Sequence, residues 1–436
     1  MSLKKLGGVY APHFKNTASF TPEAIPVPAE VRLPMSMHEG VPANPVVSIG
    51  DYVKVGQVIG EAAGTVSSPV HASVSGKIKS IDRLDGLTGK KAVSVTITSD
   101  GSQTFYEGLS PVNVTNLTEF LDAVKNSGVV GLGGAGYPTA AKLTLKETVK
   151  LDYILINGAE CEPYITSDTR TMLDDAGYVW EGILLMKEYL KPKNIVICIE
   201  KNKPGPIKKM RELCAGTEGV RVHVLPSLYP QGERKVLVYN VTGRIVPEGA
   251  RLPDVGCVVI NCTTVATFAK YIKTGIPLVS KCVTVDGSAV KQPKNVIAPI
   301  GTQVRYLFEY CGGLKEDVKK IILGGAMMGS AIPNLDVPIV KVTNAVLAFS
   351  AKDAEPPAAE ACIKCGRCVS RCPMSLMPPY IENAFELKKP ELLKKYKVNM
   401  CAECACCAFT CPAKRPLVQV MTLSKKMLRE YREAKN

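Results

Sequence analysis

The sequence is short of histidine, of aromatic residues and of long apolar runs. Only four of its 436 residues are histidines, and because they are scattered we assign none of them to catalysis or to a metal. Aromatic residues make up 6% of the chain, and no nucleic-acid-binding module is recognisable. We therefore predict no nucleic-acid partner, although the net charge is +14.

Apolar residues make up 46% of the chain, yet no stretch of 18 consecutive apolar residues occurs. The longest candidate, Ile321–Ile332, is short and rich in glycine, so we predict a buried segment and not a membrane span. The chain is expected to be soluble or peripheral to a membrane. Residues 351–436 contain 16 Lys and Arg but only 9 Asp and Glu. A basic face there would suit an anionic membrane or an acidic redox partner.

Cysteine, in contrast, is abundant, and eight of the 16 cysteines follow one repeated spacing. Two runs near the C-terminus each read C-x2-C-x2-C-x3-C and are each followed by proline. This is the spacing of two-cluster bacterial ferredoxins, in which the fourth cysteine of each run binds the other cluster. We therefore predict two [4Fe-4S] clusters. The first is assigned to Cys362, Cys365, Cys368 and Cys411, and the second to Cys401, Cys404, Cys407 and Cys372.

Zinc and disulfide bonds are the competing explanations of these cysteines. A structural zinc site needs one set of four ligands, usually in two C-x2-C pairs, and not two identical quadruplets. Disulfides suit a secreted chain, but Met1–Gly8 shows no signal peptide, so we expect a reducing compartment. The remaining cysteines, Cys406 among them, are expected to be free thiols that are mostly buried.

Changes of pattern along the chain predict a multidomain α/β protein. An N-terminal extension, residues 1–29, precedes short Val- and Gly-rich strands in residues 30–111 that resemble a biotinyl/lipoyl-type barrel-sandwich domain. The matching hairpin tip, Glu61–Thr65, lacks the lysine that carries such a cofactor, so we expect a structural or docking role. Strands and helices then alternate in residues 112–275, which indicates a Rossmann-like domain with a parallel sheet.

Two further parts complete the expected architecture. Residues 276–345 are predicted to form a small β-rich domain with one helix, and residues 346–361 a linker. Residues 362–436 form the cysteine-rich helical domain, which ends in an amphipathic helix over Leu417–Ala434. We expect its apolar side to pack on its own domain, with contact to a membrane as the alternative.

A glycine-rich loop opens the predicted Rossmann-like domain. Gly131, Gly133, Gly134 and Gly136 permit close approach of the backbone to a ligand, and Pro138 suits the first turn of a helix. Lys142 follows one turn later and can reach a phosphate. A nucleotide or flavin phosphate is the best occupant, and a plain turn is the alternative.

Acidic residues follow the strand that ends at Asn157. Ends of strands in such sheets face the ligand crevice, and the Asn157 amide can donate to and accept from a flavin ring. Glu160 and Glu162 cannot bind phosphate but can hold a ribose, an amide or a flavin N–H. The alternative is a solvated acidic loop.

These motifs carry a resemblance to known proteins. GLGGAGYPTAAKL and LINGAECEPYITSDTR resemble the FMN- and NADH-binding subunit of respiratory complex I. With GGVYAPHFKNTA, the sandwich segment, YPQGERKVLV, GGAMMG and the twin cysteine runs, nearly the whole chain resembles the C subunit of the Rnf (Rsx) ion-translocating electron-transport complex.

The resemblance implies roles for the residues already named. It places FMN on the glycine loop and beside Lys142. It also implies that Asn157, Glu160 and Glu162 contact the flavin and the nicotinamide. A further stretch beside the flavin corresponds to Asn261 and Thr264. Residues 276–345 correspond to a soluble-ligand-binding β-grasp (SLBB) domain. After Gly232 this chain has Glu233 where the family has a small residue; because the complex I relative carries acids there, we expect Glu233 to contact NADH.

The resemblance also implies a function and partners. The chain would exchange hydride with NAD(H) through FMN and pass single electrons through two [4Fe-4S] clusters, in a complex that couples this chemistry to Na+ or H+ transport. Its partners would be the A, B, D, E and G subunits and, through the complex, ferredoxin, at the cytoplasmic face of the bacterial cell membrane. A corrinoid reductase with the same modules and a ferredoxin-like carrier without a nucleotide site are the alternatives.

Overall fold

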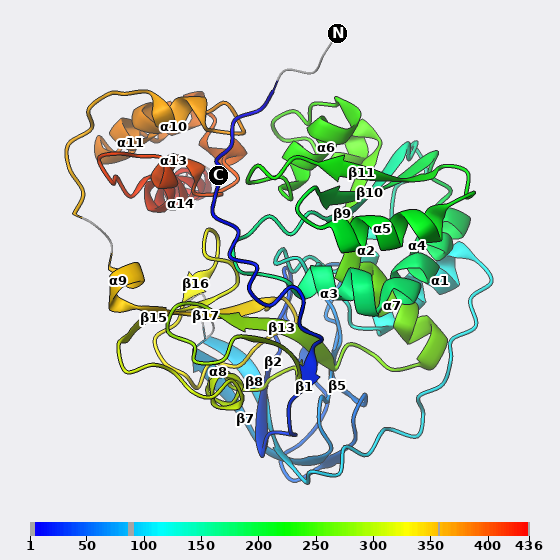
Figure 1. The fold of residues 1–436 in the computed structure, drawn as a ribbon. Coiled ribbons are helices and arrows are strands. Elements are labelled where there is room, and N and C mark those ends of the chain that lie inside the picture. The colour runs from blue at the N-terminus through cyan, green and yellow to red at the C-terminus, as the bar shows by residue number, and fades with distance from the viewer. Residues whose placement is uncertain (1–4, 86–90, 356–357, 435–436) are drawn as a thin grey trace.

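The computed structural model describes residues 5–85, 91–355 and 358–434, and Figure 1 shows their arrangement. The ends of the N-terminal extension and of the C-terminal tail, and residues 356–357 of the expected linker, lie outside the described residues. Four groups of elements follow one another along the chain. The domain boundaries given above remain predictions.

Two small sheets form the barrel-sandwich part at the bottom of Figure 1. In β2, Val31 and Leu33 are buried while their neighbours are partly exposed, as expected of a strand with one face on the core. A strand predicted over Val46–Ile49 does not form, because β3 ends at Pro45 and Ile49 is exposed. The first sheet has four strands, in the order β2 (Glu30–Pro34), β8 (Lys91–Ser99), β7 (Gly76–Asp85) and β4 (Tyr52–Val53). The second has three strands, in the order β3 (Asn44–Pro45), β5 (Val58–Glu61) and β6 (Val70–His71).

The Rossmann-like part contains the predicted four-stranded parallel sheet, in the order β11-β10-β9-β12. Alternate residues of β9 face opposite sides: Ile154 and Ile156 pack with α1, α4 and α7, and Leu155 packs with α6. The strands are β9 (Tyr153–Gly158), β10 (Asn194–Glu200), β11 (Val220–Leu225) and β12 (Cys257–Asn261). The helices are α1 (Leu117–Asn126), α2 (Thr139–Leu143), α3 (Ser167–Asp174), α4 (Ala176–Leu190), α5 (Pro204–Cys214), α6 (Arg234–Thr242), η1 (Leu252–Val255) and α7 (Cys262–Thr274).

One helix of this part differs from its sequence prediction. The pattern predicts a single helix over Thr171–Tyr189, but the structure has two, α3 and α4. They meet at Asp175, whose backbone angles (φ −105°, ψ 23°) leave the helical range. Helix α3 also begins earlier than predicted, at Ser167, directly after the acidic loop.

The β-grasp part has a six-stranded sheet, β1-β14-β13-β17-β15-β16, and one helix, α8 (Val304–Tyr310). The expected linker 346–361 is wrong at its start, because β17 (Ala345–Ser350) lies inside this sheet and α9 (Ala351–Ala354) follows it. The Ile321–Ile332 run is only partly buried: after β15 its loop exposes 52% of Met328. The other strands are β1 (Glu23–Ala24), β13 (Ser280–Asp286), β14 (Lys294–Pro299), β15 (Val318–Leu323) and β16 (Ser330–Ala331).

The cysteine-rich part is helical, as predicted. Met421 and Leu428 of α14 are buried with Ile381 of α11 and Leu393 of α12, so the apolar side of the last helix packs on its own domain. Within the described residues, no helix is long and apolar enough to cross a membrane. The helices are α10 (Arg367–Ser370), α11 (Pro378–Glu386), α12 (Pro390–Lys395), η2 (Val398–Met400), α13 (Cys406–Phe409) and α14 (Leu417–Glu433).

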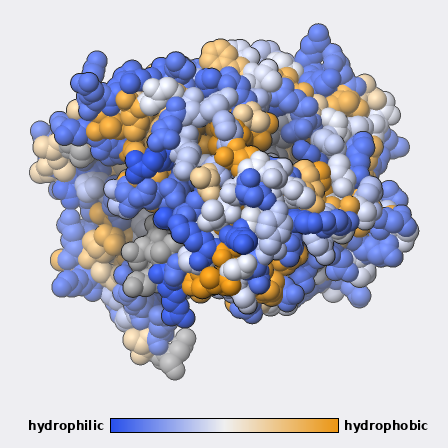
Figure 2. Space-filling view, turned by 90° about the horizontal axis from the view of Figure 1, so that it is seen from below, coloured by the Kyte–Doolittle hydropathy of each residue, from blue (hydrophilic) through white to orange (hydrophobic). Residues whose placement is uncertain are grey.

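Buried lysines join the first three parts. The Lys341 ammonium, which is 1% exposed, donates to Pro69 O (2.6 Å), Gly128 O (2.7 Å) and Ser68 Oγ (3.2 Å). Lys281 donates to Leu132 O at 3.1 Å, inside the glycine loop. Because Lys281 belongs to β13, the β-grasp part holds the glycine loop in place. On the outer face seen in Figure 2, apolar side chains form small groups among hydrophilic ones.

Candidate functional site

The predicted site residues meet at the carboxyl ends of β9 and β12, the position of the ligand crevice in such sheets, and this region is called the crevice below. The chain runs from β9 to β10 and β11 on one side, whereas β12 pairs on the other side, and Asn157 and Asn261 are register partners at the ends of their strands. Such a change of direction is the preferred ligand position in open parallel sheets. The structure therefore brings together residues that are far apart in the sequence.

The two asparagines organise the floor of this crevice. Asn157 Nδ2 donates to Gly232 O (3.0 Å), which ties the end of β9 to the loop before α6. Asn261 Oδ1 accepts from the Thr264 amide (3.1 Å), and its Nδ2 donates to Asp168 Oδ2 (2.7 Å). The sequence did not single out Asp168, although it lies in the same motif as the acidic loop.

The glycine loop lies against the start of α7. Thr264 Oγ1 accepts from the Leu132 amide (2.9 Å) and donates to Val130 O (3.2 Å). A Cβ on Gly133 would lie 3.1 Å from Asn261 Nδ2, so this glycine permits close packing of the loop on the crevice. Gly134 has φ +101°, and a Cβ there would meet no atom within 4 Å. The loop therefore offers bare backbone toward open space, as a cofactor requires.

The expected helix start behind this loop is weaker than predicted. Helix α2 has only five residues, and Pro138 at its N-cap makes no side-chain hydrogen bond. An anion would therefore be held mainly by loop amides and side-chain cations.

Lys142, the cation that follows the loop, is affected by the charge of a second cation, Arg234. Lys142 is partly buried, and within the described part of the chain its ammonium donates one long hydrogen bond, to Val259 O at 3.4 Å. Burial, together with the Arg234 cation, lowers the pKa of Lys142 to about 8. A bound anion would favour the charged form of Lys142 against both effects, so these two cations suit a phosphate. Arg234 was not assigned a role from the sequence.

The predicted acidic residues lie at the crevice but already have protein partners. The Glu160 carboxylate accepts the Asp168 amide (2.6 Å) at the start of α3, and burial raises its pKa although Lys15 and Lys203 oppose the rise. Glu162 accepts from the Tyr229 hydroxyl (3.1 Å) and from the Met327 amide (2.9 Å).

Glu233 also has protein partners. Its Oε2 accepts the amides of Lys235 (2.7 Å) and Val236 (2.9 Å), which makes it the N-cap of α6. Burial raises the pKa of Glu162 and of Glu233. The three carboxylates, Glu160, Glu162 and Glu233, thus shape the crevice indirectly, by binding the starts of α3 and α6 and the neighbouring loops.

Buried lysines fix the backbone of the acidic loop. Lys15 Nζ donates to the carbonyls of Glu160 (2.8 Å), Glu162 (2.7 Å) and Ile165 (2.6 Å), and burial lowers the pKa of Lys15 to about 8. Lys203 Nζ donates to Ala159 O at 2.8 Å. No sequence signal pointed to Lys15, because its acceptors lie some 150 residues farther along the chain.

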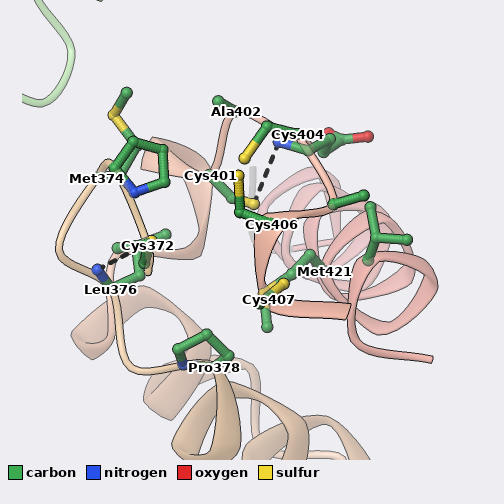
Figure 3. A pocket seen from close by; sticks show the side chains of 14 residues that line it. Cys372, Met374, Leu376, Pro378, Cys401, Ala402, Cys404, Cys406, Cys407 and Met421 are labelled. Carbon is green, nitrogen blue, oxygen red and sulfur yellow. Dashed lines mark hydrogen bonds between the residues drawn. The ribbon is translucent and has the colours of Figure 1, made fainter. Parts of the chain in front are cut away.

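The second predicted set of cysteines surrounds one cavity. Figure 3 shows the side chains that line this hollow. Burial raises the pKa of Cys401 to about 11 and that of Cys407 to about 12, and in both cases neighbouring sulfurs, including Cys372, contribute. The lining includes Cys372, Cys401, Cys404 and Cys407. The cysteine from the first run is therefore in place beside three from the second, as crossed ligation requires.

For the first set, burial raises the pKa of Cys368, and the charges of Cys411 and Cys362 raise it further. The crossed ligation of this set stays a prediction. Cys362 and Cys365 are exposed. No three His, Cys, Asp or Glu side chains within the described ranges lie close enough to hold a single metal ion.

The second cysteine set faces the crevice. Cys404 and Cys406 form an apolar cluster with Tyr229 and Val9, and Cys161 of the acidic loop packs against it. Cys406 Sγ lies 3.8 Å from Tyr229 O. Since the Tyr229 hydroxyl also binds Glu162, one residue contacts both the cysteine loop and the acidic loop.

Comparisons with known proteins agree with this arrangement. Residues 3–102 match the family described as RnfC barrel sandwich hybrid domain, residues 124–270 the Nuo51 FMN-binding domain, and residues 282–331 the SLBB domain. A chain of an NAD+-reducing [NiFe]-hydrogenase in the air-oxidized state superposes with a TM-score of 0.51 at 15% identity, covering 72% of this chain and 63% of that one. That likeness is one of fold alone. The fold and the site define a multidomain protein built around an FMN-binding domain.

Two relatives make the family specific. The chain is 39% identical to the C subunit of the proton-translocating ferredoxin:NAD(+) oxidoreductase complex of Clostridium ljungdahlii, over 85% of this chain and 82% of the relative. It is 37% identical to the C subunit of the Na(+)-translocating ferredoxin:NAD(+) oxidoreductase complex of Acetobacterium woodii, over 85% of each. The chain belongs to this family, the C subunits of Rnf ion-translocating oxidoreductase complexes, which confirms the resemblance seen in the sequence.

Proposed function

We propose that this chain is the subunit through which an Rnf complex exchanges electrons with NAD(H). Family membership and the match to an FMN-binding domain support the proposal. The observation that carries it is the packing of the second cysteine set on Tyr229, whose hydroxyl binds the acidic loop at the flavin crevice. A nicotinamide–flavin site and an iron–sulfur site would thereby be neighbours.

FMN would be held by the glycine loop and its surroundings. Backbone groups around Gly131, Gly133, Gly134 and Gly136 would approach the cofactor, with Thr264 and Asn261 supporting the loop from behind. Lys142 and Arg234 would bind the phosphate. The Asn157 amide would contact the flavin ring edge, and Glu160, Glu162 and Glu233 would shape the nicotinamide side through the loops they hold. When bound, FMN supplies the chemistry that links a two-electron hydride to one-electron carriers.

The cysteines would hold two [4Fe-4S] clusters with crossed ligation. NADH releases two electrons as a hydride, and two cubes that each take one electron balance that pair. The second set, Cys401, Cys404, Cys407 and Cys372, lies next to the crevice and would exchange electrons with it first. The first set includes the exposed Cys362 and Cys365 and would exchange electrons with a partner.

The partners and the location follow from the family. We place the chain at the cytoplasmic face of the bacterial cell membrane as a peripheral subunit, with the A, B, D, E and G subunits as partners and ferredoxin reached through the complex. The transported ion is Na+ or H+, and the two relatives named above differ in this respect. The basic excess of residues 351–436 suits an acidic redox partner.

Anaerobic reconstitution of the full chain tests this function. We expect about one FMN and about eight irons per chain, as two four-iron cubes require, and bleaching of both chromophores by NADH. Iron without flavin, or flavin that NADH cannot reduce, would contradict the proposal and favour a ferredoxin-like carrier.

The crossed ligation has its own test. Cys411→Ser should remove the first cluster and leave the second, because crossed ligation assigns Cys411 to the first cluster. Cys406→Ser is the control and should retain both clusters. Iron content and electron paramagnetic resonance of the reduced protein distinguish the two, and loss of the second cluster alone in Cys411→Ser would refute the assignment.

A further inference from the structure

The first described residues run along the seam between the cysteine-rich part and the Rossmann-like part. In Figure 1 this segment is the dark blue chain that passes beside α13 and α14 and then descends toward β1. We call residues 7–15 the strap. Beyond the family resemblance, no role was predicted for it from the sequence, yet both of its ends contact the redox site.

The upper end of the strap lies against the loop that carries Cys372. A Cβ on Gly7 would lie 2.6 Å from Cys372 O, and a Cβ on Gly8 would lie 2.7 Å from Tyr229 O. Contacts shorter than 3.0 Å to backbone atoms cannot be relieved by moving a side chain. Glycine at these two positions therefore lets the strap touch the second cysteine set and the loop before α6 at once.

The middle of the strap pairs with Tyr229 as a short antiparallel bridge. Val9 N donates to Tyr229 O (2.9 Å), and Tyr229 N donates to Val9 O (3.0 Å). The Val9 side chain is buried in the same apolar cluster as Cys404 and Cys406. Val9 thus fixes the backbone of the residue that contacts both the cysteine loop and Glu162.

The lower end of the strap is anchored in the acidic loop. Lys15 binds three carbonyls of this loop, as described above, and the Tyr164 amide donates to His13 O (2.9 Å). The loop needs such an anchor, because Glu160 has φ +45° and Tyr164 has φ +69°, which ordinary residues adopt at a cost.

We propose that the strap positions the second cysteine set against the acidic loop and so sets the separation across which electrons pass between the flavin crevice and that cluster. The inference rests on the proposed function. Two direct contacts between the parts involve sulfur, Cys406 Sγ with Tyr229 O at 3.8 Å and Lys235 Nζ with Met400 Sδ at 3.6 Å. Sulfur is a weak hydrogen-bonding atom. The strap is bonded to Tyr229, on the Rossmann-like side of the seam, by N–H···O bonds of normal length. It touches the cysteine-rich side by packing, with Gly7 against Cys372 O and the Val9 side chain against Cys404 and Cys406.

Val9→Pro in the full, reconstituted chain tests the role of the strap, since proline removes the amide that donates to Tyr229 O. Two readouts are needed. Hydrogen exchange at the Tyr229 amide should become faster. In stopped-flow mixing with NADH, bleaching of the flavin should keep its rate, while bleaching of the iron–sulfur absorbance should slow about tenfold or more, as small misplacements of reacting groups do.

Tyr10→Ala is the matched control, because Tyr10 is 70% exposed and its neighbouring position carries the bridge. It should match the unmodified chain in both readouts. If Val9→Pro lowers the iron content, Gly8→Ala is the second variant. The new Cβ would clash with Tyr229 O without removing a hydrogen bond. Gly8→Ala should therefore also slow the bleaching of the iron–sulfur absorbance.

Wild-type cluster bleaching in a Val9→Pro or Gly8→Ala protein with full iron would overturn the proposal. Failure of the unmodified chain to bleach its flavin with NADH would instead contradict the proposed function, so the two failures are distinguishable. Equal slowing of flavin and cluster bleaching in the variants would also overturn it, because the strap would then act on the crevice as a whole.

Discussion

At the scale of single residues, Lys142 carries the clearest consequence for cofactor binding. Its charge is partly buried and is repelled by that of Arg234, so a bound phosphate would be attracted by both cations. We expect Lys142→Met to weaken FMN binding by about 10- to 100-fold, the usual range for a lost charged hydrogen bond. Titration of flavin-free protein with FMN, followed by flavin fluorescence, measures this. Lys146→Met, at an exposed position four residues on, is the control and should bind FMN normally.

Because Lys341 is buried, we expect it to make the free energy of unfolding depend on pH. Burial lowers its pKa to about 7, whereas an unfolded lysine titrates near ~10.4. Between these values the unfolded chain binds a proton that the folded chain lacks, so this residue makes stability rise as pH increases from about 7 to 10. Lys341→Met removes that contribution. Its denaturation midpoint should therefore change less between about pH 7 and about pH 9.5 than that of the unmodified chain; equal changes would contradict the prediction.

At the scale of elements, α6 gives a test of what Glu233 does. As the N-cap of α6 it should be replaceable by serine, which caps well but is too short to reach a ligand. We expect Glu233→Ser to keep both stability and the KM for NADH. Glu233→Ala should lose about 1 kcal/mol of stability. A raised KM in the serine variant would instead show that the carboxylate contacts NADH, as the sequence suggested.

The helices and strands also show how much of the fold can be predicted from the sequence. Strands β9, β10 and β12 were predictable because each contains a continuous apolar run, and β11 because its apolar residues alternate with Arg221 and His223. The break between α3 and α4 was not, because residues 171–189 keep a helical pattern through Asp175. Strand β17 was assigned to a linker, because it owes its place in the sheet to pairing with the distant β13 and β15.

The residues of the candidate site likewise divide into those that the sequence predicts and those that it does not. The cysteine spacing was enough to predict the crossing of the two runs, which the cavity around Cys372 and Cys401 supports, because ligand spacing is a local property. Lys15, Arg234 and Tyr229 were not found as site residues. Their importance comes from contacts between parts of the chain, and one sequence contains no record of those contacts.

At the scale of the whole molecule, the position of the second cysteine set predicts an order of electron transfer. Cys401→Ser should remove the second cluster and interrupt the route from the crevice to the first. We expect NADH to reduce the flavin of this variant but not its remaining cluster, whereas dithionite should reduce both. Anaerobic spectra after each reductant check this. Reduction of the first cluster by NADH at the normal rate would show that the crevice reaches it directly.

The strap also has a consequence for how the protein is made. Tyr229 is synthesised more than 200 residues after the strap, and Cys372 more than 350 residues after it. The strap must therefore wait without its final neighbours until both of these residues have left the ribosome. Domains that fold in turn during translation can be completed one by one, but the seam between the Rossmann-like and cysteine-rich parts closes only after both have been made.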